Sequence, residues 1–253
     1  MRQVAKRRLR PDPGAMKLLV LAGGFGTRLR SVVEDVPKAL APIGNVPFLH
    51  MQIEHWINQG LTSFVFLLHH QADLIINFLN DEQHGFLEHC EVRWLVEPAP
   101  LGTGGAVAYA VQQLRLSGSF LVTNADTWLG TGAQDVLQAT APAMAVVRVA
   151  DAGRYGRVIL DVHGNVTEFH EKSNSADAGW INAGLCLLDA QLFQDWNQQP
   201  FSLEQVCFPA LAASGALKGV ALNTDFIDIG IPADYRKFCD RAIHDRHNRP
   251  ERT

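Results

Sequence analysis

The chain has 253 residues, of which 47% are hydrophobic and 19% charged, as is typical of a globular protein with one large or two small domains. Its net charge of -4 and its scattered aromatic residues exclude the basic, aromatic-rich surface of a nucleic-acid-binding protein. No apolar run approaches the roughly 18 residues that a membrane-spanning helix needs, so we expect neither nucleic acid nor a membrane as a partner.

Two features bear on where the chain works: its N-terminus and its cysteines. The residues before Met16 are basic and contain two prolines, but they lack the apolar stretch of a signal peptide. We expect residues 1–15 to be a disordered basic tail, and contact with nucleic acid or an anionic membrane is the less favoured interpretation. The four cysteines lie far apart without a C-x-x-C pair, which predicts reduced, mostly buried thiols and a cytoplasmic protein.

Short apolar runs alternate with helical patterns in the first half of the chain. In chain order we predict a strand at 17–22, a helix at 47–60, a strand at 63–69, a helix at 72–79, a strand at 91–96, a helix at 104–114 and strands at 119–123 and 144–149. Strands that alternate with helices pair in parallel and are covered on both faces. This order predicts a doubly wound α/β fold.

The second half is richer in strands. Residues 154–161, 165–169 and 180–188 are strand-like, and the first two are joined by a predicted hairpin turn at 162–165. Helices are predicted at 202–211 and 232–243. No Pro/Gly/Ser-rich linker and no internal repeat divides the chain. We therefore expect one domain over 16–245, followed by a flexible C-terminus over 246–253.

The stretch L21-A-G-G-F-G-T-R-L-R30 places glycines and arginines directly after a strand. Such a turn exposes backbone N–H groups, and the positive end of a following helix attracts an anion. Arg28 can bind phosphate oxygens with two hydrogen bonds, which favours a polyphosphate. The dinucleotide pattern G-x-G-x-x-G is disfavoured because Leu29 stands where the third glycine should be. On its own, the stretch is equally consistent with a simple tight turn.

Six further segments must be considered together with this stretch. L21–R30, followed by V36-P-K-A-L-A-P-I43, resembles the signature of sugar-phosphate nucleotidylyltransferases, which join a nucleoside triphosphate and a sugar 1-phosphate with release of pyrophosphate. In the family's order come segments similar to its base-recognition loop (97–106), metal motif (124–127), sugar and phosphate contact (169–172), sugar-ring contact (181–184) and closing metal-binding turn (225–232). The resemblance covers roughly residues 16 to 240. It implies a Rossmann-like, mostly parallel sheet of the glycosyltransferase-A-like nucleotidyltransferase type, with a smaller antiparallel sugar-binding part.

The resemblance also implies roles for individual residues. The catalytic residues would be Arg28, Lys38, Asp126 and Lys172. The nucleotide would be bound by Leu21, Ala22, Gly23, Gly24, Gly26, Thr27, Glu97, Gly102 and Thr103. The sugar would be bound by Gly104, Glu171 and Asn182, and Mg²⁺ by Asp126 and Asp228. Mg²⁺ suits such a site because it prefers one or two carboxylates together with phosphate oxygens.

Each of these residues also has a simpler interpretation. A lysine after proline is usually a solvated surface group, and an isolated aspartate usually forms a turn or caps a helix. Glu171 and Lys172 are adjacent on an apparent strand, so they would point to opposite faces and could form a surface ion pair. Trp180 fits core packing better than a sugar pocket. Ala125 stands where many relatives have glycine, which leaves the metal ligand intact but puts the local backbone geometry in doubt.

Which nucleotide base and which sugar 1-phosphate the protein would use are narrower questions than its family. Glu97 could accept hydrogen bonds from the N1–H and amino group of guanine, so GTP is the first choice. L101–A106 and R154–V158 look most like the heptose 1-phosphate guanylyltransferase branch. Uridylyltransferases of hexose or muramate 1-phosphate and mannose 1-phosphate guanylyltransferases remain alternatives. So does a non-catalytic NDP-sugar-binding subunit, although Lys38, Asp126 and Asp228 are all present. The sequence leaves open whether the chain forms a homo-oligomer.

Overall fold

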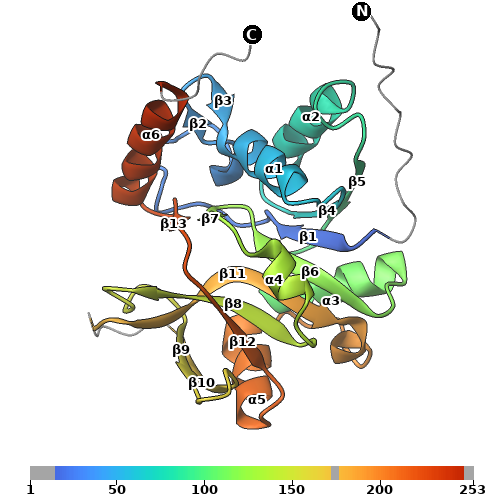
Figure 1. Cartoon of the computed structure of the whole chain (residues 1–253). Coiled ribbons are helices and arrows are strands. Elements are labelled where there is room, and N and C mark those ends of the chain that lie inside the picture. The colour runs from blue at the N-terminus through green and yellow to red at the C-terminus, as the bar shows by residue number, and fades with distance from the viewer. Residues whose placement is uncertain (1–14, 172–176, 248–253) are drawn as a thin grey trace, which may run out of the picture.

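The structure is a computed structural model that describes residues 15–171 and 177–247. The predicted basic tail up to residue 14, the candidate Lys172 and the residues after 247 lie outside the described residues. Within the described part, nine strands form one sheet (Figure 1). Its parallel part has the strand order β6-β1-β4-β5, with β1 at Lys17–Leu21, β4 at Ser63–Leu68, β5 at Glu91–Val96 and β6 at Ser119–Asn124.

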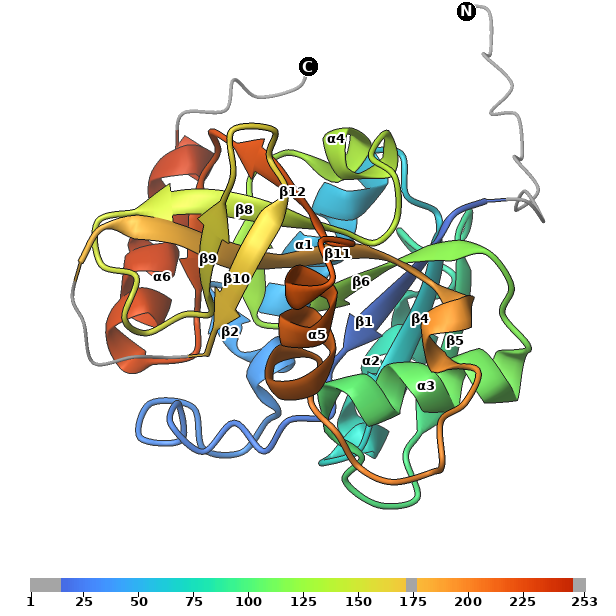
Figure 2. The ribbon, with the colours of Figure 1, turned by 90° about the horizontal axis from the view of Figure 1, so that it is seen from below.

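Helices cover both faces of this parallel part, as the α/β pattern predicted. Because side chains alternate along a strand, Leu18 and Val20 of β1 face one core and Leu19 faces the other. The first core includes α1 (Phe48–Asn58), α2 (Ala72–Glu82) and α4 (Ala133–Leu137), and the second includes α3 (Gly102–Leu114). In Figure 2, α3 lies in front of the sheet and α1 and α2 lie behind it. The doubly wound α/β prediction is confirmed.

The other part of the sheet is antiparallel and is attached through one long strand. β11 (Gly179–Asp189) pairs antiparallel with β6, with β8 (Ala143–Val149) and with β9 (Arg157–Leu160). β10 (Val166–His170) completes a hairpin with β9, and β12 (Lys218–Leu222) lies parallel to β8. The hairpin turn predicted at 162–165 is confirmed, because the Asp161 carboxylate accepts backbone N–H bonds from His163 and Asn165.

Residues 144–149 form β8, which runs in the same direction as β6 but does not pair with it, because β11 lies between the two strands and is antiparallel to both. β8 is buried on both faces and so reads as an apolar run, whatever the direction of its neighbours. β11 comes later in the chain, and β12 pairs parallel with β8 on its other side.

Two small ribbons and the last helix form a third layer. β7 (Thr127–Leu129) pairs antiparallel with β13 (Phe226–Asp228), and β2 (Pro42–Ile43) pairs with β3 (Val46–Pro47). α6 (Pro232–His247) extends two residues past the predicted domain end at 245. Phe48, Ile227 and Phe238 join these elements in a separate core. The remaining elements are the short helical turns Lys38–Leu40, Ala190–Phe193 and Leu203–Cys207, and α5 (Phe208–Ala213).

The cysteines are free but less buried than predicted. Cys186 is buried, whereas Cys90, Cys207 and Cys239 are half-buried. Burial raises the pKa of Cys90 and of Cys207 to about 11, so these thiols are protonated and unreactive near neutral pH.

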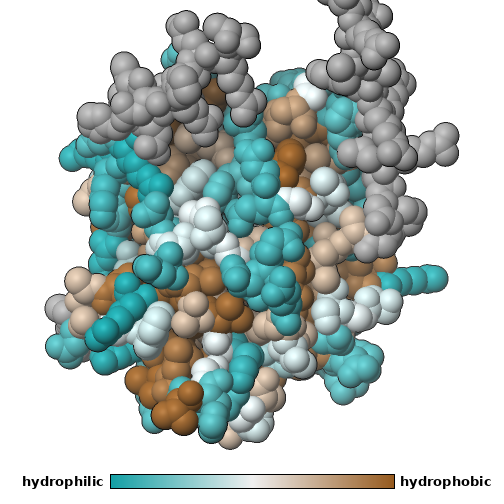
Figure 3. Space-filling model, in the orientation of Figure 1, coloured by the Kyte–Doolittle hydropathy of each residue, from teal (hydrophilic) through white to brown (hydrophobic). Residues whose placement is uncertain are grey.

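Hydrophobic residues at the surface are interspersed with polar ones. On the face shown in Figure 3 the hydrophobic side chains gather over the lower part of the sheet and α5, and hydrophilic side chains break them up. Among the described residues, no helix is both long and apolar enough to cross a membrane.

Candidate active site

A cavity of about 600 Å³ opens where the parallel strands end. Backbone hydrogen bonds hold the departing loops side by side: Ala22 N–H donates to Leu67 O, Ala125 N–H to Leu21 O and Glu97 N–H to Leu68 O. The carboxyl edge of a parallel sheet is where α/β proteins bind their ligands. Thirteen predicted site residues line this cavity: Leu21, Ala22, Gly23, Gly24, Gly26, Thr27, Arg28, Lys38, Glu97, Gly102, Thr103, Asp126 and Asp228.

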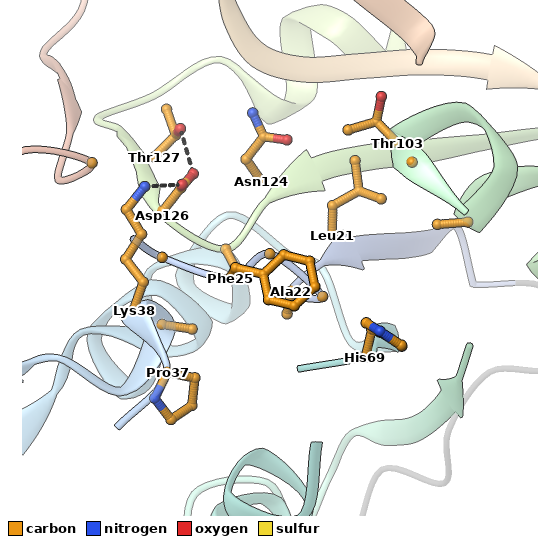
Figure 4. A pocket seen from close by; sticks show the side chains of 18 of the residues that line it. Leu21, Ala22, Phe25, Pro37, Lys38, His69, Thr103, Asn124, Asp126 and Thr127 are labelled. Atoms are coloured by element: carbon orange, nitrogen blue, oxygen red, sulfur yellow. Dashed lines mark hydrogen bonds and ion pairs between the residues drawn. The ribbon is translucent and has the colours of Figure 1, made fainter. Parts of the chain in front are cut away.

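A lysine and two aspartates meet at one end of the cavity. Lys38 Nζ lies 2.5 Å from Asp126 Oδ2 (Figure 4). It also lies 3.8 Å from Asp228 Oδ1. Only 14% of the Lys38 side chain is exposed, so it is not the solvated surface group that the simpler interpretation assumed. The side chain leaves a short 3₁₀ turn after Pro37 and points inward.

The two aspartates are 102 positions apart in sequence, and the small ribbon joins them. Thr127 of β7 is paired with Asp228 of β13, and Ile229 N–H donates to Asp126 O. Gly230 fits tightly beside them: a Cβ there would lie 2.6 Å from Asp228 Oδ1 and 2.8 Å from Lys38 Nζ. Burial and the nearby Asp126 carboxylate raise the pKa of Asp228, so Lys38 does not fully compensate its negative charge.

The glycine-rich loop lies open beside these charged groups. A Cβ on Gly24 would meet no atom within 4 Å, and Gly26 has a φ of +61°, which favours glycine. The expectation of a helix directly after the loop is wrong, since residues 27–32 form turns and the next helical element starts at Lys38. Attraction for an anion here therefore comes from backbone N–H groups, Arg28 and Lys38. Arg28 is exposed and makes no ion pair with another described residue.

Glu97 and the start of α3 form another wall. Glu97 is 8% exposed, and its Oε2 accepts a 2.9 Å hydrogen bond from Leu101 N–H. Its other oxygen faces Gly23, where a Cβ would come within 3.1 Å of Oε1. Burial raises the pKa of Glu97. Gly102 begins α3 with a φ of +73°, so the tight turn into the helix favours glycine.

Gly104 packs inside the protein and does not line the cavity. The N–H groups of Gly104 and Gly105 both donate to Phe201 O, so this carbonyl provides the hydrogen bonds that the first N–H groups of α3 cannot make within the helix. A Cβ on Gly104 would lie 2.7 Å from Phe201 Cζ and closer still to two other ring carbons.

We therefore expect Gly104→Ala to destabilise the fold by about 1–3 kcal/mol through overpacking. Gly24→Ala is the matched control, because its Cβ enters open space, and it should unfold at the same denaturant concentration as the wild type. Equal midpoints for Gly104→Ala and the wild type would contradict the packing role.

The remaining sugar-binding candidates lie beyond the cavity. Glu171, just after β10, accepts a hydrogen bond from Gln205 Nε2. Asn182 belongs to an irregular part of β11, where its Oδ1 accepts from Gly184 N–H. Trp180 packs against the second core, as its simpler interpretation predicted. Neither Glu171 nor Asn182 lines the cavity of the ligand-free protein.

Sequence reasoning missed several cavity residues. Phe25 lies inside the quoted glycine motif, and Asn124 ends β6 two residues before Asp126, so both had a positional signal. His69 follows β4, at the same sheet edge as the predicted residues. Glu204 belongs to a distant helical segment that contained no recognised motif, and no signal pointed to it.

The cavity is lined by more acidic than basic side chains, which favours the binding of a cation. Four acidic residues line it (Glu97, Asp126, Glu204 and Asp228), against the two basic residues Arg28 and Lys38. Among the described residues, no three histidine, cysteine or acidic side chains cluster as a metal site by themselves. Asp126 and Asp228 nevertheless fit Mg²⁺, which takes one or two carboxylates and completes its shell with phosphate oxygens and water.

An open sheet edge, a glycine loop and a lysine between two aspartates suit the binding of phosphate groups. A model of the nucleotidyl transferase family matches residues 17–242, and the chain belongs to that family. It is a nucleotidyltransferase.

Its relatives are similar over nearly the whole chain. The D-glycero-alpha-D-manno-heptose 1-phosphate guanylyltransferase of Campylobacter jejuni is 32% identical over 228 residues, which cover 88% of this chain and 98% of the relative. Mannose-1-phosphate guanylyltransferase 1 of Arabidopsis thaliana is 33% identical, over 87% of this chain but only 63% of the relative. The crystal structure of HddC from Yersinia pseudotuberculosis complexed with GMP-PN superposes with a TM-score of 0.78 at 32% identity, covering 90% of this chain and 99% of that one.

Proposed function

We propose that this protein transfers the guanylyl group of GTP to a heptose 1-phosphate, giving a GDP-heptose and pyrophosphate. The observation that carries the proposal is the meeting of Lys38, Asp126 and Asp228 beside the glycine loop. Support for the substrates comes from the relatives, one of which is a heptose 1-phosphate guanylyltransferase matched over 98% of its length. Mannose 1-phosphate is the second candidate, but its plant guanylyltransferases are matched over only 63% of theirs.

The reaction brings two anions together, so positioning and charge neutralisation dominate its catalysis. An oxygen of the sugar phosphate attacks the α-phosphorus of GTP, and the bond to the β-phosphate oxygen breaks. Backbone N–H groups of Gly23–Gly26 bind the triphosphate, and Arg28 holds the leaving pyrophosphate. Lys38 turns from Asp126 to the α-phosphate, where its ammonium stabilises the developing negative charge.

Asp126 and Asp228 would hold Mg²⁺, which supplies charge neutralisation to both phosphate groups. In the ligand-free protein the Lys38 ammonium balances part of the negative charge of these carboxylates. A bound cation would release Lys38 for the α-phosphate. Lys172 and Glu171 are proposed to contact the sugar phosphate and the sugar hydroxyls, together with Asn182.

Guanine recognition is assigned to Glu97. We expect Glu97→Gln to weaken GTP use by about 1–3 kcal/mol while affecting UTP less, because the amide replaces an acceptor for guanine with a donor. The Gln carbonyl can still accept from Leu101 N–H, so the loop should keep its structure. The measurement is kcat/KM for each nucleotide; equal losses for GTP and UTP would remove Glu97 from base recognition.

The substrate assignment is tested by pyrophosphate release from purified protein with Mg²⁺ and a matrix of four nucleoside triphosphates against several sugar 1-phosphates. We expect the highest kcat/KM for GTP with D-glycero-D-manno-heptose 1-phosphate. A preference for UTP or dTTP would contradict the assignment of guanine as the recognised base. A preference for mannose 1-phosphate would contradict the assignment of a heptose 1-phosphate as the sugar substrate. Binding without turnover of any pair would identify a regulatory subunit.

A further inference from the structure

Glu204 lines the cavity from a segment that none of the motifs includes. Its Oε2 accepts two hydrogen bonds from hydroxyl groups, at 2.6 Å from Thr103 Oγ1 and at 2.7 Å from Ser202 Oγ. Its other oxygen, Oε1, makes no hydrogen bond to any residue in the described ranges. One oxygen therefore anchors the side chain, and the other is available to a ligand.

The local fold does not need this carboxylate as a cap. Ser202 Oγ already accepts from the N–H groups of Glu204 and Gln205, which caps the helical turn Leu203–Cys207. Thr103 Oγ1 also accepts from Leu203 N–H, so the two segments are joined without Glu204. A half-buried carboxylate that is not needed for capping, in a cavity wall, suits a binding role.

The position of Glu204 indicates the chemistry that it binds. In Figure 4, Thr103 lies across the pocket from Lys38 and Asp126, and Glu204 is hydrogen-bonded to Thr103. An acidic side chain would repel phosphate but accepts strong hydrogen bonds from hydroxyl groups. Its neighbour Gln205 donates to Glu171, which connects this segment to the end of β10.

We propose that Glu204 Oε1 accepts a hydrogen bond from a hydroxyl group of the bound substrates and thereby helps to select them. Both the ribose of the nucleotide and the ring of the sugar 1-phosphate carry such hydroxyls. The proposal rests on the proposed function, since it takes these two molecules as the ligands.

Glu204→Gln isolates this interaction. The Gln carbonyl can still accept from Thr103 and Ser202, while its amide turns the cavity-facing acceptor into a donor. We expect an unchanged melting temperature and a rise in KM of about tenfold or more for the substrate whose hydroxyl is bound, with a smaller change in kcat. Glu54→Gln, on the exposed face of α1, is the same-type control and should leave KM within about twofold.

Deoxy substrates identify the hydroxyl. Wild type and Glu204→Gln are compared with GTP, 2′-deoxy-GTP and 3′-deoxy-GTP, and with heptose 1-phosphate and its monodeoxy analogues. The variant's KM defect should disappear with the one analogue that lacks the bound hydroxyl, on the ribose or on the sugar. A variant equal to wild type, or a defect that persists undiminished with every analogue, overturns the proposal.

A failure of the proposed function would look different. If the wild type turns over no nucleotide and sugar pair, the function falls, and titration calorimetry with the GDP-heptose still tests Glu204. A Kd at least about tenfold weaker in Glu204→Gln than in wild type would support it. Equal Kd values, or no binding by the wild type, would overturn it.

Discussion

Asp126→Asn and Asp228→Asn are each expected to lose about a hundredfold or more in turnover while staying folded. Asparagine has nearly the shape of aspartate, so the substitution removes the charge and little else. Because burial and Asp126 raise the pKa of Asp228, the ionised carboxyl costs the folded protein free energy at pH values above its ordinary pKa. Asp228→Asn removes this cost, and its melting temperature without ligand should equal or exceed that of the wild type.

Three further measurements complete this prediction. The double variant should lose much less than the product of the single losses, since residues that serve one ion act as a unit. Mg²⁺ with GTP should raise the melting temperature of the wild type more than that of either variant. Asp240→Asn, exposed on α6, is the same-type control and should turn over normally. Turnover in EDTA, or near-normal turnover of either active-site variant with saturating Mg²⁺, would make the two aspartates structural turn residues.

Lys38→Met should reduce kcat by about a hundredfold or more, because it removes the ammonium assigned to the α-phosphate. The substitution also leaves Asp126 and Asp228 facing each other without their shared cation, so the ligand-free protein should be less stable. Added Mg²⁺ should restore the melting temperature but not the turnover, since a divalent cation can balance the carboxylates without replacing Lys38 at the phosphate.

The comparison for this variant is Lys237→Met, which removes an exposed lysine of α6 and should change neither property. If Lys38→Met retained wild-type kcat and lost only stability, Lys38 would be a structural counter-ion for the aspartates.

Local patterns in the sequence predicted much of the fold. The apolar runs that became β1, β4, β5 and β6 are short and bounded by turn residues, so their type was readable without long-range information. The order of the strands within the sheet could not be predicted in the same way. β8 follows β6 in the sequence and runs in the same direction, yet the later strand β11 lies between them. The β7–β13 ribbon was missed because three-residue strands carry no periodicity.

The candidate site was predictable where side chains follow the ends of strands. Asp126 lies two residues after the end of β6, and the edge of a parallel sheet suggests a ligand crevice. Asp228 came only from the resemblance, because its approach to Lys38 depends on the β7–β13 ribbon. Gly104 was predicted to bind the sugar because it lies within a binding motif, but it packs against Phe201. Phe201 is 97 positions away in the sequence, so a local sequence pattern could not reveal this contact.

The central claim is that the cavity transfers a nucleotidyl group from GTP to a sugar 1-phosphate, and isotopic labelling tests it most directly. Purified protein is incubated with Mg²⁺, heptose 1-phosphate and GTP labelled at either the α- or the γ-phosphorus. The account predicts that α-label appears in the GDP-sugar and γ-label in pyrophosphate. Release of γ-label as inorganic phosphate, or α-label that stays in GTP or GDP while the wild-type protein binds both substrates, would contradict it.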